Sequence, residues 1–154
     1  MAPFILSVRP LPDSQLDSDT LARRGVPALA APLLEPQPIA PTLPDDPSRY
    51  AGLIFTSRHA VDGFLAALGH GGPGGWAALP VFAVGRATAR VARAAGFSVK
   101  VTGHGGGGGL APLIREHVDA GGLPLLWPAA RDRGFDMVAA LAPAITVEDI
   151  AVYA

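Results

Sequence analysis

Arginine side chains, hydroxyl groups and a glycine turn gather directly after apolar segments that the sequence predicts as strands. The segments are residues 4–8, 51–55 and 81–84, and the residues that follow them are Arg9, Thr56, Ser57, Arg58, Gly85, Arg86 and Thr88. In open α/β sheets, ligands bind beyond the carboxyl ends of the strands, where helices begin. Guanidinium groups, hydroxyls and free N–H groups at helix N-termini all bind anions. The pattern therefore predicts an anion-binding edge.

Two further arginines, Arg131 and Arg133, follow the predicted strand 123–127. Eleven of the 12 basic residues are arginine, and Lys100 is the single lysine. Arginine binds carboxylates and phosphates through a forked set of donors. Arginines in exposed loops are also ordinary solvated charges, so the residue pattern by itself leaves both interpretations open.

The sequence offers few residues for metal, nucleophilic or acid–base chemistry. It contains no cysteine, which excludes disulfides, thiolate metal sites and cysteine nucleophiles. Its four histidines lack metal-ligand spacing, so we expect surface histidines and no metal site. Ser57 has no G-x-S-x-G elbow and no obvious base beside it, which favours a helix cap or hydrogen-bond donor over a nucleophile. With only three glutamates, a paired-carboxylate mechanism is disfavoured.

Five consecutive glycines, residues 105–109, follow one predicted strand and precede a helix. They satisfy a G-x-G-x-x-G pattern from Gly103, as in dinucleotide-binding loops. However, no acidic residue stands at a convincing ribose position, and no Lys-Ser/Thr pair follows. We therefore predict a flexible turn here, and keep a nucleotide-binding module as the weaker alternative.

Composition and charge narrow the classes of partner. The chain has 154 residues, of which 49% are hydrophobic and 16% charged, with a formal net charge of -1. Such a balance disfavours a polyanion-binding surface, so we expect no nucleic-acid partner. The longest uncharged stretch, residues 63–85, is interrupted by glycine and proline, which argues against a membrane span. The lack of cysteine is compatible with the reducing cytoplasm, where we expect the protein.

Strand-like and helix-like segments alternate along the chain. The predicted strands are 4–8, 28–34, 51–55, 81–84, 98–101, 123–127 and 146–153. The predicted helices are 13–24, 61–68, 87–95, 110–118 and 135–141, the first capped by Asp13 or Ser14 and the second by Thr56 or Ser57. This alternation predicts an α/β fold, a Rossmann-like (flavodoxin-like) parallel sheet flanked by helices.

A proline-rich segment divides the chain. Five prolines fall within residues 36–47, a stiff stretch that cannot join a central strand, so we place a domain boundary there. The β–α–β piece before it is too small to fold alone. The final predicted strand is followed by no closing helix, although a parallel sheet needs both faces covered. We therefore expect further chain to complete a second domain.

Six segments of the chain follow one another in the order of a known set of motifs. Residues 52–61 (GLIFTSRHAV) contain TSxxAV, and residues 84–89 (VGRATA) contain VGxxTA. The others are 8–10 (VRP), 31–35 (APLLE), 125–128 (LLWP) followed by Arg131, and 147–153 (VEDIAVY). In type, order and spacing they resemble the uroporphyrinogen-III synthase family over nearly the whole chain. Val8 replaces the usual threonine, and Ala129 stands where glycine is usual.

The resemblance implies a domain organisation. The family folds as two Rossmann-like domains joined by a two-stranded linker, and one of the domains is discontinuous in sequence. Residues 1–35 would then be a fragment of the discontinuous domain with the first linker strand. Residues 36–146 would form the contiguous α/β domain, and 147–154 the return linker strand. Segments 28–34 and 147–153 would pair with each other.

The resemblance also implies a reaction. The family cyclises hydroxymethylbilane, a linear tetrapyrrole with eight carboxylates, to uroporphyrinogen III in heme biosynthesis. Water is lost and the last pyrrole ring is inverted. No metal or organic cofactor is implied, and no nucleic-acid or membrane partner. The expected protein is thus a cytoplasmic bacterial lyase that is a monomer in the family; for this shorter chain, an oligomer or a partner chain stays open.

Position by position, Ser57, Thr88 and Tyr153 match family residues that face the cleft. Tyr153 is the candidate catalytic residue, which would help the hydroxyl group leave as a hydrogen-bond donor or weak acid. Arg9, Arg58 and Arg86 would offset substrate carboxylates, an expectation that rests on the strand-end pattern, with Thr56 and Gly85 beside them. The plainer alternatives are that Tyr153 anchors the linker and that Ser57 and Thr88 cap helices.

Three functional hypotheses follow. The first is a uroporphyrinogen-III synthase, or a piece of one. The second is a truncated, inactive relative that acts as a module binding an anionic ligand or a partner chain. The third is an unrelated Rossmann-like nucleotide-binding module, which rests on the glycine run 105–109 alone.

Overall fold

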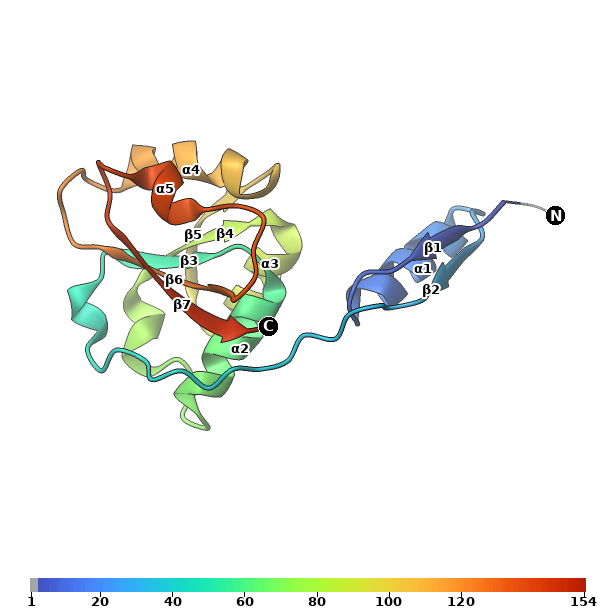
Figure 1. Cartoon of the computed structure of the whole chain (residues 1–154), viewed down its shortest axis with the longest axis horizontal. Coiled ribbons are helices and arrows are strands. Elements are labelled where there is room, and N and C mark those ends of the chain that lie inside the picture. Colours follow the sequence, from blue (N-terminus) through green and yellow to red (C-terminus); the bar gives the residue numbers. More distant parts are fainter. Residues whose placement is uncertain (1–2) are drawn as a thin grey trace. The chain divides into compact units, whose positions relative to one another are not determined.

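The computed structural model describes residues 3–154, and the chain divides between Gln37 and Pro38 into two compact units (Figure 1). The division falls inside the proline-rich segment. The first unit, unit 1, consists of β1 (Ile5–Ser7), α1 (Asp13–Arg23) and β2 (Ala28–Ala30), and its two strands pair in parallel. Unit 1 is therefore a single β–α–β motif.

The start of α1 differs from the prediction. Its N-cap is Pro12, and no side chain caps the helix, so the predicted caps Asp13 and Ser14 are wrong. Asp13 instead lies in the first turn, where it accepts a hydrogen bond from Arg9 at 3.0 Å. An acidic residue in the first turn stabilises the positive end of the helix dipole without capping it.

The second unit, unit 2, is built on a five-stranded, fully parallel sheet in the order β5-β4-β3-β6-β7. Its strands are β3 (Gly52–Phe55), β4 (Pro80–Val84), β5 (Ser98–Gly103), β6 (Leu125–Ala130) and β7 (Val147–Tyr153). Numbered within the unit this order is 3-2-1-4-5, the Rossmann order, whereas a flavodoxin-like sheet has the order 2-1-3-4-5. The order reverses between β3 and β6, which makes the gap between these two strands the topological switch point.

Helices cover both faces of this sheet (Figure 1). They are α2 (Arg58–Leu68) and α3 (Gly85–Ala94) on one face, and α4 (Gly106–His117) and α5 (Met137–Leu141) on the other, with short 3-10 turns at Pro47–Arg49 and Gly74–Ala78. Strand side chains alternate between the two layers: Leu53 and Phe55 pack under α2 and α3, and Ile54 packs under α4 and α5. Burial on both faces explains why these strands are apolar throughout.

Residues 106–109 of the glycine run begin a helix, which corrects the prediction of a flexible turn. Gly106 begins α4, and Gly105 precedes it in the left-handed region with a φ of 73°. A methyl group at Gly109 would lie 1.7 Å from the carbonyl oxygen of His104, so only glycine allows this close approach. Tertiary packing has thus overridden the low helix propensity of glycine.

The predicted pairing of 28–34 with 147–153 joins residues of two different units, and within each unit these segments have other neighbours. β7 pairs in parallel with β6 along its length, and β2 pairs with β1. The linker meets β7 further along, through an antiparallel bridge between Pro38 and Tyr153 and a 2.9 Å hydrogen bond from the Ile39 N–H to the Val152 carbonyl. Val152 is fully buried against the α2 layer, so β7 belongs to the core of unit 2.

No helix within residues 3–154 has the length and apolar character needed to cross a bilayer.

Candidate active site

A cavity of about 400 Å³ opens at the carboxyl ends of β3, β6 and β7 in unit 2. Its lining residues are Thr56, Ser57, Gly107, Trp127, Ala129, Ala130, Asp132, Arg133, Gly134, Phe135 and Tyr153. Because β3 and β6 flank the topological switch point, the cavity lies where open α/β sheets bind ligands. Its volume is within the range of small-molecule sites, which runs from roughly 300 to 1,000 Å³.

Ser57 and Tyr153 form the hydroxyl pair of this cavity. Ser57 follows β3 and is the N-cap of α2, where its Oγ accepts a 3.1 Å hydrogen bond from the N–H of Ala60. The same Oγ lies 2.8 Å from the phenol oxygen of Tyr153, the last residue of β7. The predicted cap by Ser57 is therefore confirmed, and it does not exclude a role in the cavity.

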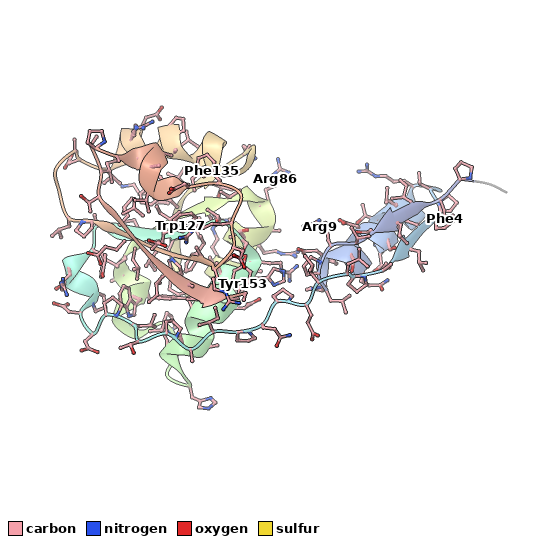
Figure 2. All side chains as sticks on the ribbon, viewed as in Figure 1. Phe4, Arg9, Arg86, Trp127, Phe135 and Tyr153 are labelled. Atoms are coloured by element: carbon pink, nitrogen blue, oxygen red, sulfur yellow. The ribbon has the colours of Figure 1, made fainter. Side chains whose placement is uncertain are left out.

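Trp127 supplies an aromatic wall on β6, next to the strand that carries Tyr153 (Figure 2). It is 2% exposed, and its Nε1–H donates to the Thr56 hydroxyl at 3.3 Å. The guanidinium carbon of Arg133 lies 4.6 Å from the centroid of the Trp127 ring, and Arg133 also forms an ion pair with Asp149 on β7. A cation over the ring face and a carboxylate beside it together hold the guanidinium in one place.

Phe135 and Gly107 close the cavity on the side of α4. A methyl group at Gly107 would come within 2.3 Å of Phe135 Cδ1, so the aromatic ring packs directly against the glycine backbone. Part of the glycine run therefore provides a wall of the cavity. Packing against Phe135 accounts for glycine at this position without a bound phosphate.

The structure brings together some of the predicted site residues and not others. Thr56, Ser57 and Tyr153 share the cavity. Arg58 is the first residue of α2 and directly follows Ser57, but its side chain is outside the lining. The predicted site after β4 also lies outside this lining.

The residues after β4 form the first turn of α3. Gly85 begins the helix with a φ of 76°, which favours glycine, and Arg86 is exposed. Thr88 is buried within α3. The cap of this helix is Val84, without a side-chain hydrogen bond, so the alternative that Thr88 caps the helix is wrong.

Arg9 lies in unit 1 and has carboxylate partners there. Its guanidinium forms ion pairs with Asp13 at 3.0 Å and Asp17 at 3.1 Å, and Asp17 also accepts a 2.9 Å hydrogen bond from Ser7. Arg9 is exposed in spite of these pairs. Exposed ion pairs exchange partners readily because they contribute little stability, about 0–1 kcal/mol.

Sequence reasoning missed three aromatic or charged walls of the cavity. Trp127 and Phe135 were interpreted only as apolar strand and helix positions, and Arg133 only as one of several strand-end arginines. The signal for Trp127 was present: tryptophan carries a polar N–H that needs a partner when buried. Thr56 directly after β3 provides that partner, but their proximity depends on the pairing of β3 with β6.

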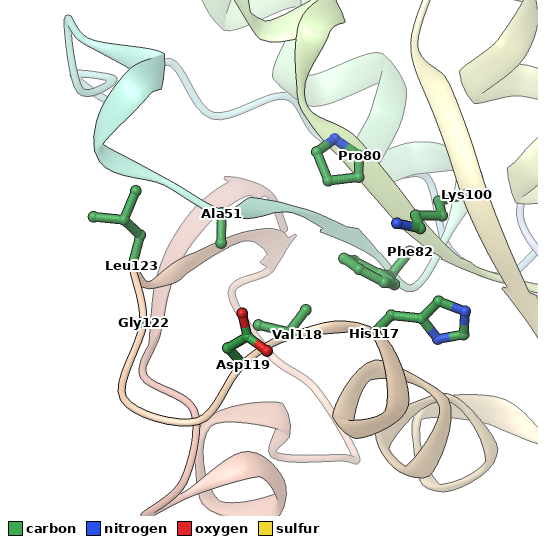
Figure 3. A pocket seen from close by; sticks show the side chains of 9 residues that line it. All are labelled: Ala51, Pro80, Phe82, Lys100, His117, Val118, Asp119, Gly122 and Leu123. Carbon is green, nitrogen blue, oxygen red and sulfur yellow. The ribbon is translucent and has the colours of Figure 1, made fainter.

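A second cavity, of about 230 Å³, lies at the opposite, amino edge of the same sheet (Figure 3). The ring of Phe82 and the side chains of Ala51 and Leu123 form its apolar part, and Lys100 and His117 stand at it with Asp119. These three polar side chains are exposed. This edge holds the starts of the strands, which is not where open α/β sheets place their ligands.

Comparison with known proteins finds a family whose sequence pattern this chain shares. A sequence model of the family described as uroporphyrinogen-III synthase HemD matches residues 17–154. Among curated proteins, a sequence search finds no significant match.

Solved structures of uroporphyrinogen III synthases share the fold. A mutant enzyme from the extremely thermophilic bacterium Thermus thermophilus superposes with a TM-score of 0.64 at 18% identity, and the wild-type enzyme with 0.57 at 20%. The enzyme from Helicobacter pylori gives 0.58 at 20% identity. In each comparison 99% of this chain is covered, whereas the chain spans only 61–62% of the length of the other protein.

Proposed function

This chain belongs to the uroporphyrinogen-III synthase family, and we propose that it carries out the family reaction, the cyclisation of hydroxymethylbilane to uroporphyrinogen III. The observation that carries the proposal is the Ser57–Tyr153 hydroxyl pair, 2.8 Å apart, in a cavity at the switch point of the sheet. Both residues belong to segments that resemble motifs of the family. The proposed activity is that of a cyclising lyase.

Tyr153 acts in this proposal on the leaving hydroxyl of the substrate. A phenol donates a hydrogen bond, or a proton, to the hydroxyl as its carbon–oxygen bond breaks, and water leaves. Phe135, which is 37% exposed, provides apolar surface for a pyrrole ring beside the phenol, and the buried Trp127 supports this side of the cavity. The substrate also closes without help, so the main task of the cavity is to hold the terminal ring in the geometry that gives the inverted isomer.

Arginines offset the substrate carboxylates in the same proposal. Arg133 stands in the cavity, and Arg58 follows Ser57 at the same edge of the sheet. Arg86 and the backbone of Gly85 at the start of α3 are assigned a second anion-binding position at the carboxyl end of β4, and Thr88, buried in the same helix, is assigned to it from the family motif alone. Arg9 is assigned the same role from unit 1.

The domain organisation is proposed on the same basis. Residues 1–35 are a fragment of a discontinuous domain with its first linker strand, 36–146 the contiguous domain, and 147–154 the return strand. In support, Phe4, Leu29 and Leu33 of unit 1 are 56%, 56% and 75% exposed, as expected for strands and a linker that further structure covers. We place the protein in the bacterial cytoplasm, as a monomer when the second domain is complete and otherwise with a partner chain or second copy.

An isomer assay tests the proposed function. The 154-residue chain is mixed with freshly prepared hydroxymethylbilane, the product is oxidised, and type I and type III uroporphyrin are separated by chromatography. We expect type III in excess over a blank without protein, because the unaided reaction gives the uninverted type I isomer. Type I alone, at the rate of the blank, would overturn the activity of this chain and leave a binding module.

A further inference from the structure

Ser57 Oγ has two partners of different kinds. It accepts a 3.1 Å hydrogen bond from the Ala60 N–H, one of the free N–H groups in the first turn of α2. It lies 2.8 Å from the phenol oxygen of Tyr153. One hydroxyl oxygen thus joins the N-terminus of an α-helix to the candidate acid of the cavity.

The N-cap bond favours one direction for the Ser57–Tyr153 hydrogen bond. A hydroxyl that accepts from an N–H becomes a better donor and a poorer acceptor, because hydrogen bonds in a chain polarise one another. The positive end of the α2 dipole acts in the same sense. Either hydroxyl can be the donor at this distance, and the polarisation favours Ser57, an arrangement that leaves the Tyr153 proton for a group in the cavity.

We propose that Ser57 is a positioning residue that donates its hydrogen bond to Tyr153, relays the N-terminus of α2 to the phenol, and aims the phenol O–H into the cavity. This inference rests on the proposed function and extends it. The ring of His59 lies beside the phenol, with its centroid 5.9 Å from that of Tyr153 and the two planes tilted by 55°. Ser57 thereby acts through Tyr153 and needs no contact with the substrate.

The proton balance of the step is complete. Tyr153 Oη gives its proton to the hydroxyl oxygen of the substrate while the carbon–oxygen bond breaks, and a water molecule leaves. The Ser57 O–H then donates to a phenolate oxygen, and such a charge-assisted bond is stronger than a neutral one. The pyrrole carbon that forms the new carbon–carbon bond loses a proton, and this proton restores the phenol.

The variant Ser57→Gly removes the hydroxyl while keeping the helix start, because glycine caps helices almost as well as serine. Ser57→Thr restores a hydroxyl and is the rescue variant. Asp136→Gly is the matched control: Asp136 caps α5 through a 3.1 Å bond from the Ala139 N–H and lies outside the cavity lining. Comparison of the three variants separates loss of a cap from loss of the relay.

The first readout is spectroscopic and needs no turnover. The ring Raman doublet of tyrosine distinguishes a phenol oxygen that accepts a hydrogen bond from an O–H that only donates. Tyr50→Phe leaves Tyr153 as the single tyrosine of the chain. In the Tyr50→Phe variant we expect the doublet of a phenol oxygen that accepts a hydrogen bond. When Ser57→Gly is added to this variant, we expect that pattern to disappear. A donor-only pattern, or a doublet that does not respond to Ser57→Gly, would overturn the inference.

The second readout is the rate of type III formation. With Ser57→Gly we expect kcat to fall about tenfold while KM changes less than about twofold, since the lost interaction acts on the transition state. Ser57→Thr should recover most of kcat, and Asp136→Gly should change it less than about twofold. Equal losses with Asp136→Gly and Ser57→Gly would overturn the inference. If type III never forms, the proposed function fails, whereas the Raman result still decides the direction of the bond.

Discussion

The two tyrosines of this chain lie at opposite ends of the strands of one sheet, and one bonds to a charged group whereas the other bonds to a neutral one. At the amino edge, Tyr50 is 3% exposed, stands 5.7 Å from the ring of Trp76, and donates a 2.5 Å hydrogen bond to the carboxylate of Glu148. At the carboxyl edge, Tyr153 is half-buried, borders a cavity, and bonds to the neutral hydroxyl of Ser57. Both partnerships involve β7, which begins at one edge and ends at the other.

The difference lies in what each partner does to the phenol proton. Burial raises the pKa of Tyr50 to about 12, and the hydrogen bond and negative charge of Glu148 raise it in the same direction. A phenol that holds its proton this firmly, with its O–H already donated, serves structure. Ser57, the partner of Tyr153, carries no charge, and in the proposed mechanism the proton of Tyr153 goes to the substrate. The comparison teaches that the partner, more than the residue type, distinguishes a structural tyrosine from the tyrosine proposed as the acid.

The largest expected effect is a difference in catalytic rate between variants of the two tyrosines. Tyr153→Phe should lower the rate of type III formation about 100-fold, the lower end of what a positioned acid contributes. Tyr50→Phe should leave that rate within about twofold, because its hydroxyl is committed to Glu148. The isomer assay measures both. Equal losses in the two variants would end the functional distinction between the two edges.

Stability should show the reverse order. Tyr50→Phe removes a buried hydrogen bond to a charged group and should lower the free energy of unfolding by about 1–2 kcal/mol. Tyr153→Phe removes a bond at the border of a cavity and should lower it by less than about 0.5 kcal/mol. Urea unfolding followed by Trp fluorescence measures the two values. A larger loss for Tyr153→Phe would show that its bond to Ser57 is structural.

The pH dependence of stability sharpens the comparison at the amino edge. The pKa of Tyr50 is about 12 in the folded protein, against a usual value of 10.0, so the folded state binds the proton more tightly. The stabilisation is therefore fully present below pH 10 and is lost as the pH rises from 10 towards 12. Unfolding curves in this range should show a decline that is weaker in Tyr50→Phe. An unchanged decline in the variant would assign it to other groups.

The smallest expected effects concern the cations at the two cavities. Arg133→Met should raise KM about threefold, because the partly exposed Arg133 guanidinium no longer offsets a substrate carboxylate. Lys100→Met, at the amino-edge cavity, should change KM less than about 1.5-fold, as is usual for a surface substitution far from a site. Initial rates at several substrate concentrations measure both. A clear rise in KM for Lys100→Met would mean that the amino edge also contacts substrate.

Much of the sheet could be predicted from the sequence, because strands buried on both faces are continuous apolar runs bounded by glycine, proline and polar residues. Residues 51–55 and 98–101 were predicted as strands and form β3 and part of β5. The prediction of a flexible turn at 105–109 failed because it concerned what a segment packs against. Residues 106–109 begin α4 and pack closely against His104 and Phe135, and 147–153 lies in the sheet with Val152 buried under α2.

The candidate site divides in the same way. Thr56 and Ser57 were predictable, since local sequence fixes which residues follow a strand and cap a helix. Tyr153 entered only through the family resemblance, because 96 residues separate it from Ser57. Trp127 and Arg133 depend on the order of strands, which no local pattern encodes.

The sequence by itself determined where the apolar strands lie, which hydroxyls and arginines follow them, and the family to which these motifs point. Those properties are local, because each depends on residues that are close together in the sequence. The tertiary structure alone decided that β3, β6 and β7 are neighbours, and so that Ser57, Trp127 and Tyr153 enclose one cavity. It also decided that Tyr50 and Tyr153 face opposite edges. Strand order follows from packing between distant segments, and that packing sets which groups meet.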